Sequence, residues 1–443
     1  MFLTMGKPVI FAGAWSAVLI ALCLSAVPTS AKAATGMSLG TKDEQELDRR
    51  SLQIMKRPDF QEGVRNLEAI FRADPMAKQA AASASIPNAA AVIAYQALQS
   101  VIGSDPDRPA FMWSGDAPHS WFGMDIPWAS YGFNNQDDIY QLTGIDPHAS
   151  YEISGRWMAE RPVQIRFGLF KSDTEELPAG LDGGTVVSAA DGTFRITVDS
   201  EPANGRPNHI QVTADTAHLI VRSMLSDWAT QTPPTLSIRR VAGPPVRQPP
   251  SDAAISAEAI ARATTMTHDW LEKYGPMAYK PPANTVAAPF GRVGGWGYLT
   301  MGHFDLGPDQ ALVVTLDPAG AAYVGFELGD AWAISLEFVH HTSSLASGQV
   351  KANRNGTITY VIAATDPGVF NWLDAEGLSS ATFAIRWQKL AANASLANAV
   401  RSAEVVKLAD LREHLPADTA WVTPSERRAQ IEERAASWNR RLQ

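Results

Sequence analysis

Three landmarks recur in the same order in two parts of this chain, and they constrain its fold more than any other feature. They are a glycine before a threonine that opens an apolar segment, an asparagine before an aromatic ring, and an arginine at the end of an apolar segment. They lie at Gly192, Asn208 and Arg222 in the first part and at Gly356, Asn371 and Arg386 in the second. The intervals are 16 and 14 residues in the first part and 15 and 15 in the second. Repetition at nearly fixed spacing indicates one structural unit that occurs twice.

The segments around these landmarks have the pattern of β-strands. Short runs in which apolar and polar residues alternate, bounded by turn-forming residues, are typical of half-buried strands. In the first part they are Tyr151–Gly155, Val163–Phe170, Thr193–Val198, His209–Thr213 and His218–Ser223, and a second series begins at Leu312. The sequence therefore predicts a mainly β protein with helical additions, in which two jelly-roll-like antiparallel β-sandwich halves follow an N-terminal helical region.

Helix and linker signals surround the predicted strands. Thr41 and Glu44 form a capping pattern that opens a charged helix, and Asn88 is expected to cap an Ala-rich helix that ends at Gly103. Four prolines and a glycine within residues 241–250 are too many for packed structure, so they predict an extended linker.

Further signals complete a division into six segments. A helix is expected to begin after the linker at Ser256, and Thr423 followed by Pro424 predicts a closing helix. The predicted segments are a signal peptide, residues 1–33; a helical region, 34–110; the first β-sandwich half, 111–243; the Pro-rich linker, 244–255; a helix with the second half, 256–400; and a C-terminal helical tail, 401–443.

The first 33 residues have the three parts of a secretory signal peptide. Lys7 precedes an apolar run from Val9 to Val27, and small residues follow up to Ala33. Cleavage near Ala33 predicts a periplasmic or secreted protein with no membrane anchor. Cys23 is the only cysteine. The cleaved chain therefore has no disulfide, no thiolate metal ligand and no cysteine nucleophile.

Composition limits the classes of partner. The formal net charge is −9, and the predicted signal peptide holds two lysines and no acid, so the cleaved chain is more acidic still. An acidic chain without a basic patch is a poor partner for nucleic acid. We expect a small-molecule ligand, and the sequence leaves the oligomeric state open.

A family resemblance rests on the second part of the chain. The run from Asp366 to Asp374 reads Asp-Pro-Gly-Val-Phe-Asn-Trp-Leu-Asp, with Asn355-Gly-Thr357 before it and Ile385-Arg-Trp387 after it. This arrangement resembles the closing motif of the Domain of Unknown Function twelve-fourteen family, and the first part is similar to the upstream region of longer members. The resemblance covers about residues 110–400. It implies a jelly-roll β-sandwich in a secreted bacterial protein, and it brings no established activity.

The repeated arginines and asparagines have two interpretations each. Arg222 and Arg386 either bind a carboxylate or phosphate of a ligand through two hydrogen bonds, or tie a loop to the sheet. Asn208 and Asn371 either contact a ligand or satisfy backbone groups within a turn.

The residues beside these landmarks are the candidate acid/base groups. His209 follows Asn208 and is expected within reach of Arg222 across the same sheet, where it would transfer protons near neutral pH. Asp138 is the second acid/base candidate. In the other half Trp372 stands where the first has His209, so the two halves need not share this role.

An aromatic run precedes the first predicted strands. Trp113, Trp121 and Trp128 occur among glycines and either plug the core or line a pocket, where indole faces suit sugar rings and aromatic ligands. The polar residues that follow would orient a ligand or form a turn; they include Asn135, Asp138 and Tyr140. Calcium binding by this loop is a further alternative, although the EF-hand spacing is absent.

No catalytic signature accompanies these candidates. The chain has no Gly-x-Ser-x-Gly elbow, no phosphate loop and no dinucleotide fingerprint, and its histidines lack zinc spacing. We therefore expect no cofactor and no metal. The leading hypothesis is a binding protein for a sugar or an aromatic compound. A metal-independent lyase or hydrolase and a structural or assembly protein of the envelope are the alternatives.

Overall fold

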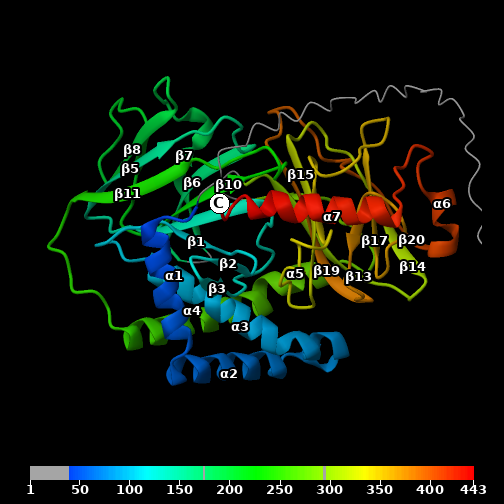
Figure 1. Ribbon diagram of the computed structural model, residues 1–443, viewed down its shortest axis with the longest axis horizontal. Coiled ribbons are helices and arrows are strands. Elements are labelled where there is room, and N and C mark those ends of the chain that lie inside the picture. Colours follow the sequence, from blue (N-terminus) through cyan, green and yellow to red (C-terminus); the bar gives the residue numbers. More distant parts are fainter. Residues whose placement is uncertain (1–38, 173–174, 293–295) are drawn as a thin grey trace, which may run out of the picture. The chain divides into compact units, whose positions relative to one another are not determined.

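The computed structural model describes residues 39–172, 175–292 and 296–443 of the chain (Figure 1). The predicted signal peptide, residues 1–33, lies outside these ranges, so export remains a prediction. Within the described ranges, no helix combines the length and the apolar character that crossing a membrane requires.

The N-terminal region is helical, as predicted. Its elements are α1 (Lys42–Met55), α2 (Pro58–Ala73), the short 3₁₀ helix η1 (Pro75–Lys78) and α3 (Ala80–Gly103). Thr41 caps α1 by accepting a hydrogen bond from the Glu44 amide at 3.1 Å. Asn88 is not a cap, because the Ala-rich residues from Ala80 onward are strong helix formers and already belong to α3.

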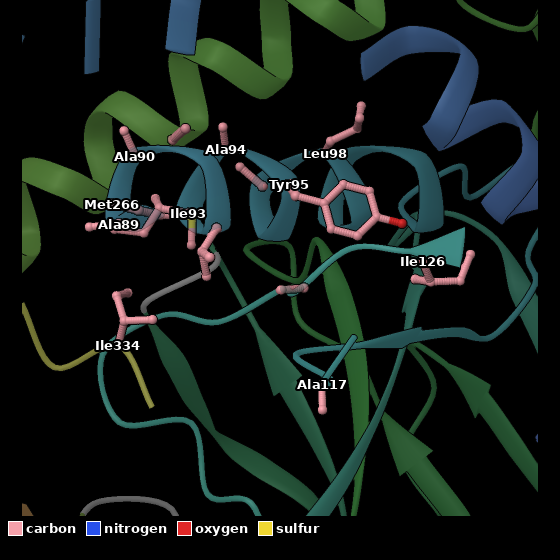
Figure 2. Packing of buried hydrophobic residues seen from close by; sticks show 14 of the residues in the cluster. Ala89, Ala90, Ile93, Ala94, Tyr95, Leu98, Ala117, Ile126, Met266 and Ile334 are labelled. Atoms are coloured by element: carbon pink, nitrogen blue, oxygen red, sulfur yellow. The ribbon is translucent and has the colours of Figure 1, made fainter. Parts of the chain in front are cut away.

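The helix after the linker joins the N-terminal helices in one core. This helix, α4 (Asp252–Asp269), packs against α2 and α3. Gly63 of α2 allows the approach, since a β-carbon there would lie 2.4 Å from Ile260 of α4. Figure 2 shows Met266 of α4 beside Ile93 of α3 and Ile334 of the second half. The helices therefore form a layer shared by both parts of the chain.

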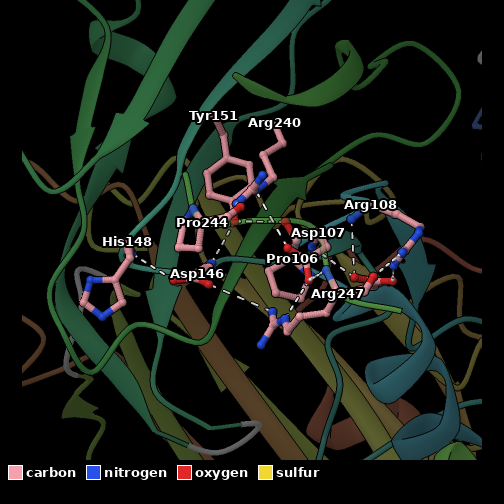
Figure 3. A network of polar contacts seen from close by, with 10 residues as sticks. Pro106, Asp107, Arg108, Asp146, His148, Tyr151, Arg240, Pro244 and Arg247 are labelled. Atoms are coloured by element: carbon pink, nitrogen blue, oxygen red, sulfur yellow. Dashed lines mark hydrogen bonds and ion pairs between the residues drawn. The ribbon is translucent and has the colours of Figure 1, made fainter. Parts of the chain in front are cut away.

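The Pro-rich linker is shorter than predicted and is fixed in place. Ser251 caps α4, so the helix begins within the segment assigned to the linker. The exposed chain between Ala242 and Asp252 is tied down by Arg247, whose Nε donates to Asp107 at 2.6 Å (Figure 3). Tyr151 extends the same network by donating to the Pro106 carbonyl at 3.0 Å. The linker is therefore attached to the segment that connects the helices to the first sandwich.

The first half is a β-sandwich of a five-stranded and a four-stranded sheet. The five-stranded sheet has the order β1 (Met112–Ser114), β4 (Asp138–Gly144), β10 (His218–Met224), β6 (Gln164–Phe170) and β7 (Glu176–Asp182). The four-stranded sheet has the order β11 (Thr235–Ala242), β5 (Ser150–Arg156), β8 (Thr193–Asp199) and β9 (His209–Gln211). A hairpin of β2 (His119–Trp121) and β3 (Met124–Ile126) and the 3₁₀ turn η2 (Gly183–Thr185) complete this half.

The second half repeats this arrangement. Its five-stranded sheet has the order β12 (Phe290–Gly291), β13 (Tyr298–Asp305), β19 (Ser380–Gln388), β15 (Tyr323–Gly329) and β16 (Ser344–Ala346). Its four-stranded sheet has the order β18 (Trp372–Asp374), β17 (Ile358–Ala363), β14 (Gln310–Leu316) and β20 (Val400–Lys407). β20 corrects the sequence-based division, which placed residues 401–407 in a helical tail, and β12 and β13 precede the predicted start at Leu312.

The two sandwiches match strand for strand. β4 to β11 of the first correspond in order to β13 to β20 of the second, and β1 corresponds to β12. The pairings are antiparallel except for one parallel pair in each four-stranded sheet, β8 with β9 and β17 with β18. Arg222 and Arg386 lie on the corresponding strands β10 and β19. The predicted fold class, two β-sandwich halves after a helical region, is therefore confirmed.

The C-terminal helix contacts both sandwiches. A π-helical turn η3 (Trp270–Tyr274) and α5 (Gly275–Tyr279) follow α4, while η5 (Leu408–Asp410), α6 (Leu411–His414) and α7 (Pro424–Asn439) close the chain. Beside α7, Arg440 donates to the Trp228 carbonyl of the first half at 2.7 Å. Arg434 of α7 donates to the Ser344 hydroxyl of the second half at 2.8 Å. Figure 1 shows α7 in red beside the labels β10 and β15.

Candidate functional site

A cavity of about 350 Å³ is lined by both five-stranded sheets and by the helical layer. Leu219 and Val221 of β10 point into the first sandwich core, so the alternating Ile220 and Arg222 point outward. Ile220 and Arg222 line the cavity from the first sheet, and Arg386 does so from the second. The repeated arginines of the two halves therefore line a single cavity.

Aromatic side chains form much of the remaining wall. Trp270 and Tyr274 come from η3, whose wider π-helical turn is a feature common at functional sites. Trp270 is 2% exposed and packs edge-on against Phe133, with ring centroids 5.9 Å apart. Trp296, between β12 and β13, adds a further indole. These rings give the cavity flat apolar faces.

Arg222 is held in place by an acid and by an indole ring. Its Nε donates to Asp138, which also accepts a hydrogen bond from the Tyr140 hydroxyl at 3.2 Å. The Arg222 guanidinium lies 4.2 Å from the centre of the Trp296 ring, a cation–π contact. Burial opposes the charge on Arg222, but the neighbouring carboxylate more than offsets burial and raises the pKa of the guanidinium above its ordinary value.

Arg386 is held by a different set of acceptors. Its Nη1 donates to Glu327 of β15, and its Nη2 donates to the Phe133 carbonyl. Burial disfavours the charge, and the Glu327 carboxylate restores it, so the pKa of Arg386 is also raised. Both repeated arginines are therefore buried, charged and paired.

A third arginine lining the cavity, Arg292, has no such pair. Among the residues that the structure describes, its side chain has no ion pair or hydrogen bond. Burial, together with the charges of Arg222 and Arg386, lowers the pKa of Arg292 to about 10. The remaining acid of the wall, Glu176, is paired with Arg166 at 3.2 Å.

The predicted aromatic run lies elsewhere. Trp113 is 2% exposed and stacks on His119, with ring centroids 4.9 Å apart. The Trp121 Nε1 donates to Asp48 of α1 at 2.8 Å, and the Trp128 ring packs against Phe338. None of the three lines either described cavity. Trp113 and Trp121 lie on strands in the core that the helices cover, and Trp128 is half-buried against the same core. Of the two interpretations, plugging the core therefore fits these residues and lining a pocket does not.

The polar loop after this run joins the two sandwiches. Asn135 and Asp137 both accept hydrogen bonds from the Tyr323 hydroxyl of β15, at 3.1 and 2.7 Å. Asp137 also accepts from the Trp228 Nε1 at 2.8 Å. Asn135 lines neither described cavity and instead links the two sandwiches. Asp138 supports Arg222, and Tyr140 is among the residues that line the cavity.

The repeated asparagines have the same structural role in each half. The Asn208 side chain accepts from the Val187 amide at 2.8 Å and donates to the Val187 carbonyl at 2.7 Å. Asn371 makes the corresponding pair of bonds with Lys351, each 2.8 Å long. Neither lines the cavity, and these bonds favour the turn interpretation over the ligand interpretation for both.

The two residues beside these asparagines also lie away from the cavity. His209 is on β9 of the four-stranded sheet, whereas Arg222 is on the other sheet and faces outward, so the expected contact between them does not form. The His209 ring nitrogens contact the Thr197 hydroxyl at 2.8 Å and the Glu201 carbonyl at 2.7 Å. Trp372 is 7% exposed and donates to the Ala363 carbonyl at 3.0 Å. Both predictions are corrected.

Of the predicted ligand-binding residues, three line the cavity: Tyr140, Arg222 and Arg386. The sequence-based interpretation missed Trp270, Arg292 and Trp296. Trp296 has glycines on both sides, as in the glycine-rich aromatic run that contains Trp113. The sequence therefore held a signal for Trp296. Arg292 and Trp270 carried no comparable signal.

Comparisons with known proteins give a fold and no function. No protein-family model and no curated protein matches the chain. The chain is similar in structure to an uncharacterised protein from Burkholderia cenocepacia, with a TM-score of 0.62 and 23% identity, over 82% of this chain and 99% of that one. It is also similar to the VPA0106 protein from Vibrio parahaemolyticus, with a TM-score of 0.39 and 10% identity, over 62% of this chain and 90% of that one.

Proposed function

We propose that this protein is an exported binding protein that holds a small ring-containing compound in the cavity between its two sandwiches. The observation that carries the proposal is the cavity itself, in which flat aromatic walls and fixed guanidinium groups face the same space. Small-molecule sites are typically concave and mostly apolar, with a few polar groups that fix orientation.

The size and the wall of the cavity support this class of ligand. Its volume of about 350 Å³ lies at the lower end of the range found for small-molecule sites. Trp270 and Trp296 belong to the lining, and aromatic side chains in a cavity wall favour a ligand that itself contains a ring. Because Arg222 and Arg386 are fixed by buried acids, the polar part of the site is ordered before a ligand binds, which reduces the entropic cost of binding.

The enzyme alternative lacks a comparable observation. Of its two acid/base candidates, His209 lies on the other sheet of the first sandwich, and Asp138 is hydrogen-bonded to Arg222. None of the described residues that line the cavity is a histidine. We therefore retain binding as the single proposed function.

Thermal unfolding in the presence of a ligand panel tests the proposal. The panel holds aromatic acids, neutral aromatic compounds and sugars, because a ligand of the folded state raises its unfolding temperature by mass action. We expect at least one ring compound to raise the temperature of the wild type and to lose most of this effect in Trp296→Ala. Trp421→Ala is the control, since Trp421 lies outside the cavity.

Two outcomes would contradict the proposal. In one, no compound of the panel raises the unfolding temperature of the wild type. In the other, every compound that binds raises the unfolding temperatures of the Trp296 and Trp421 variants equally. Export is tested separately by N-terminal sequencing of protein recovered from the periplasm, which should begin close to residue 34.

A further inference from the structure

The charges around the cavity leave one cation unmatched. Arg222 is paired with Asp138, Arg386 with Glu327, and Arg166 with Glu176. Arg292, which lines the same cavity, has no acid partner among the described residues. The wall therefore carries an excess of one positive charge.

Arg292 also stands where a cation is unfavourable by itself. Burial opposes its charge most, the charges of Arg222 and Arg386 add to this opposition, and the charge of Asp138 offsets part of it. A bound carboxylate would offset the rest, because guanidinium groups bind carboxylates through two parallel, charge-assisted hydrogen bonds.

Two further guanidinium donors lack acceptors, the Nη2 of Arg222, which is 5% exposed, and the Nε of Arg386, which is 4% exposed. The second carboxylate oxygens of their acids, Oδ1 of Asp138 and Oε2 of Glu327, are also without a partner among the described residues, so each acid holds its arginine through one oxygen. These two arginines are therefore matched by acids of their own, and Arg292 is the cation of the described wall that lacks one.

The apolar wall ranges from buried to exposed. Trp270 is 2% and Trp296 is 5% exposed, as buried as Arg222 and Arg386, whereas Phe290 is 41% and Met277 is 39% exposed. Arg292 is half-buried and follows Phe290 by two residues, so the unmatched cation is close in the chain to the exposed apolar side chains of the wall.

We propose that the ligand is an aromatic monocarboxylate whose carboxylate binds Arg292 beside Arg222 and whose ring contacts the aromatic and apolar side chains of the same cavity. This inference rests on the proposed function and names its ligand class. A single negative charge matches the single unmatched cation. A doubly charged phosphate would leave excess negative charge close to Glu176.

The experiment compares 2-naphthoate with its neutral analogue 2-naphthamide on the wild type and on Arg292→Gln. Dissociation constants come from titration calorimetry or from quenching of tryptophan fluorescence. We expect 2-naphthoate to bind the wild type more tightly than 2-naphthamide, and Arg292→Gln to weaken 2-naphthoate by roughly 10- to 100-fold, the usual effect of losing a charged hydrogen-bonding pair. The affinity for 2-naphthamide should stay unchanged.

Arg412→Gln is the matched control. Arg412 also lies over an indole, 4.0 Å from the centre of the Trp421 ring, but outside the cavity. The same charge change there should leave both affinities as in the wild type. Because Arg292 has no described ion pair to lose, Arg292→Gln should unfold at a temperature no lower than the wild type, which separates a binding effect from a folding defect.

Each other outcome overturns a defined part of the argument. Equal binding of the two compounds, or a 2-naphthoate affinity that Arg292→Gln leaves unchanged, refutes the carboxylate inference and leaves the proposed function intact. An equal loss in Arg412→Gln also refutes it, because the effect would then follow net charge. If neither compound binds but another member of the ligand panel does, only the carboxylate inference fails. If no compound of the panel binds, both the carboxylate inference and the proposed function are refuted.

Discussion

The first and second sandwiches place an arginine at the same position, yet they neutralise it from opposite sides. Arg222 pairs across the sheet with Tyr140 of β4, and Arg386 pairs in the same way with Leu299 of β13. The acid for Arg222 is Asp138 on this neighbouring strand, whereas the acid for Arg386 is Glu327 on the strand at the other side. The cation on the outer face is common to both halves, and its counter-charge is not.

A second pair of equivalent positions differs more strongly. Ser114 of β1 pairs with Tyr140, and Phe290 of β12 pairs with its equivalent, Leu299. Two residues further along, the first half has Asp116 and the second half has Arg292. Asp116 is 5% exposed under the helical layer, while Arg292 lines the cavity. Equivalent positions at the edge of the sheet therefore hold a buried acid in one half and a cavity-lining arginine in the other.

The largest expected effect would come from removing a repeated arginine. Arg222→Met and Arg386→Met each leave a buried carboxylate without its partner, which typically costs about 3 to 5 kcal/mol. Urea denaturation of each variant measures this loss. The double variants Arg222→Met with Asp138→Asn and Arg386→Met with Glu327→Gln should recover much of it.

These variants test whether Arg222 and Arg386 have equivalent structural roles. If Arg222→Met costs no more than the surface change Arg412→Gln, the first arginine has no structural role. The two arginines are not equivalent in energy if the free energies of unfolding of the two single variants differ by more than about 2 kcal/mol. Such a difference is larger than the usual error with which the effects of independent mutations add.

A smaller effect, of opposite sign, is expected at Asp116. Burial and the charge of Asp48 raise the pKa of Asp116 well above its ordinary value. The folded state then binds more protons than the unfolded state, so stability falls as pH rises above the ordinary carboxyl pKa near 4. Asp116→Asn removes this dependence and should be more stable than the wild type at pH 7.5, with little change near pH 4.

Urea denaturation at the two pH values measures this gain. Asp125→Asn is the control, because Asp125 is exposed and should show no such difference. If Asp116→Asn instead lowers the free energy of unfolding at pH 7.5, the Asp116 carboxylate stabilises the fold. The contrast between a destabilising acid at this position and Arg292 at the equivalent position would then be wrong.

The smallest effects sharpen the comparison of the repeated asparagines. Asn371 is 5% exposed and makes a third bond to the Thr359 carbonyl at 2.9 Å, so Asn371→Ala should cost about 2 kcal/mol. Asn208 is less buried and has a φ of 51°, which glycine adopts without strain. Asn208→Gly should therefore cost only about 1 kcal/mol. Thermal unfolding ranks the two, and the reverse ranking would contradict the assigned hydrogen bonds.

Much of the strand pattern was predictable because it depends on local alternation. The predicted segment Thr193–Val198 lies within β8, and His218–Ser223 lies within β10, since an apolar face must recur every second residue wherever one side of a strand is buried. The same alternation shows that Arg222 and Arg386 leave the sandwich cores. Local sequence also placed the cap at Thr41, where a side-chain oxygen meets an amide three residues away.

The indole rings show where such reasoning fails. Trp113 and Trp296 both stand among glycines, and one is in the helical core while the other lines the cavity. The difference depends on α1 and α3, which cover the strand that carries Trp113. No sequence feature near Trp113 or Trp296 indicates whether helices will pack over it.

By itself, the sequence determined the repeat, most of the strands and the arginine that each half directs away from its own core. Periodicity and spacing are enough for these, because they follow from contacts between residues close together along the chain or paired within one sheet. Only the tertiary structure decided that both arginines line one cavity with Arg292 and Trp270. That cavity exists where two sheet faces and a helical layer meet, and contacts between surfaces so distant in the chain leave no local pattern.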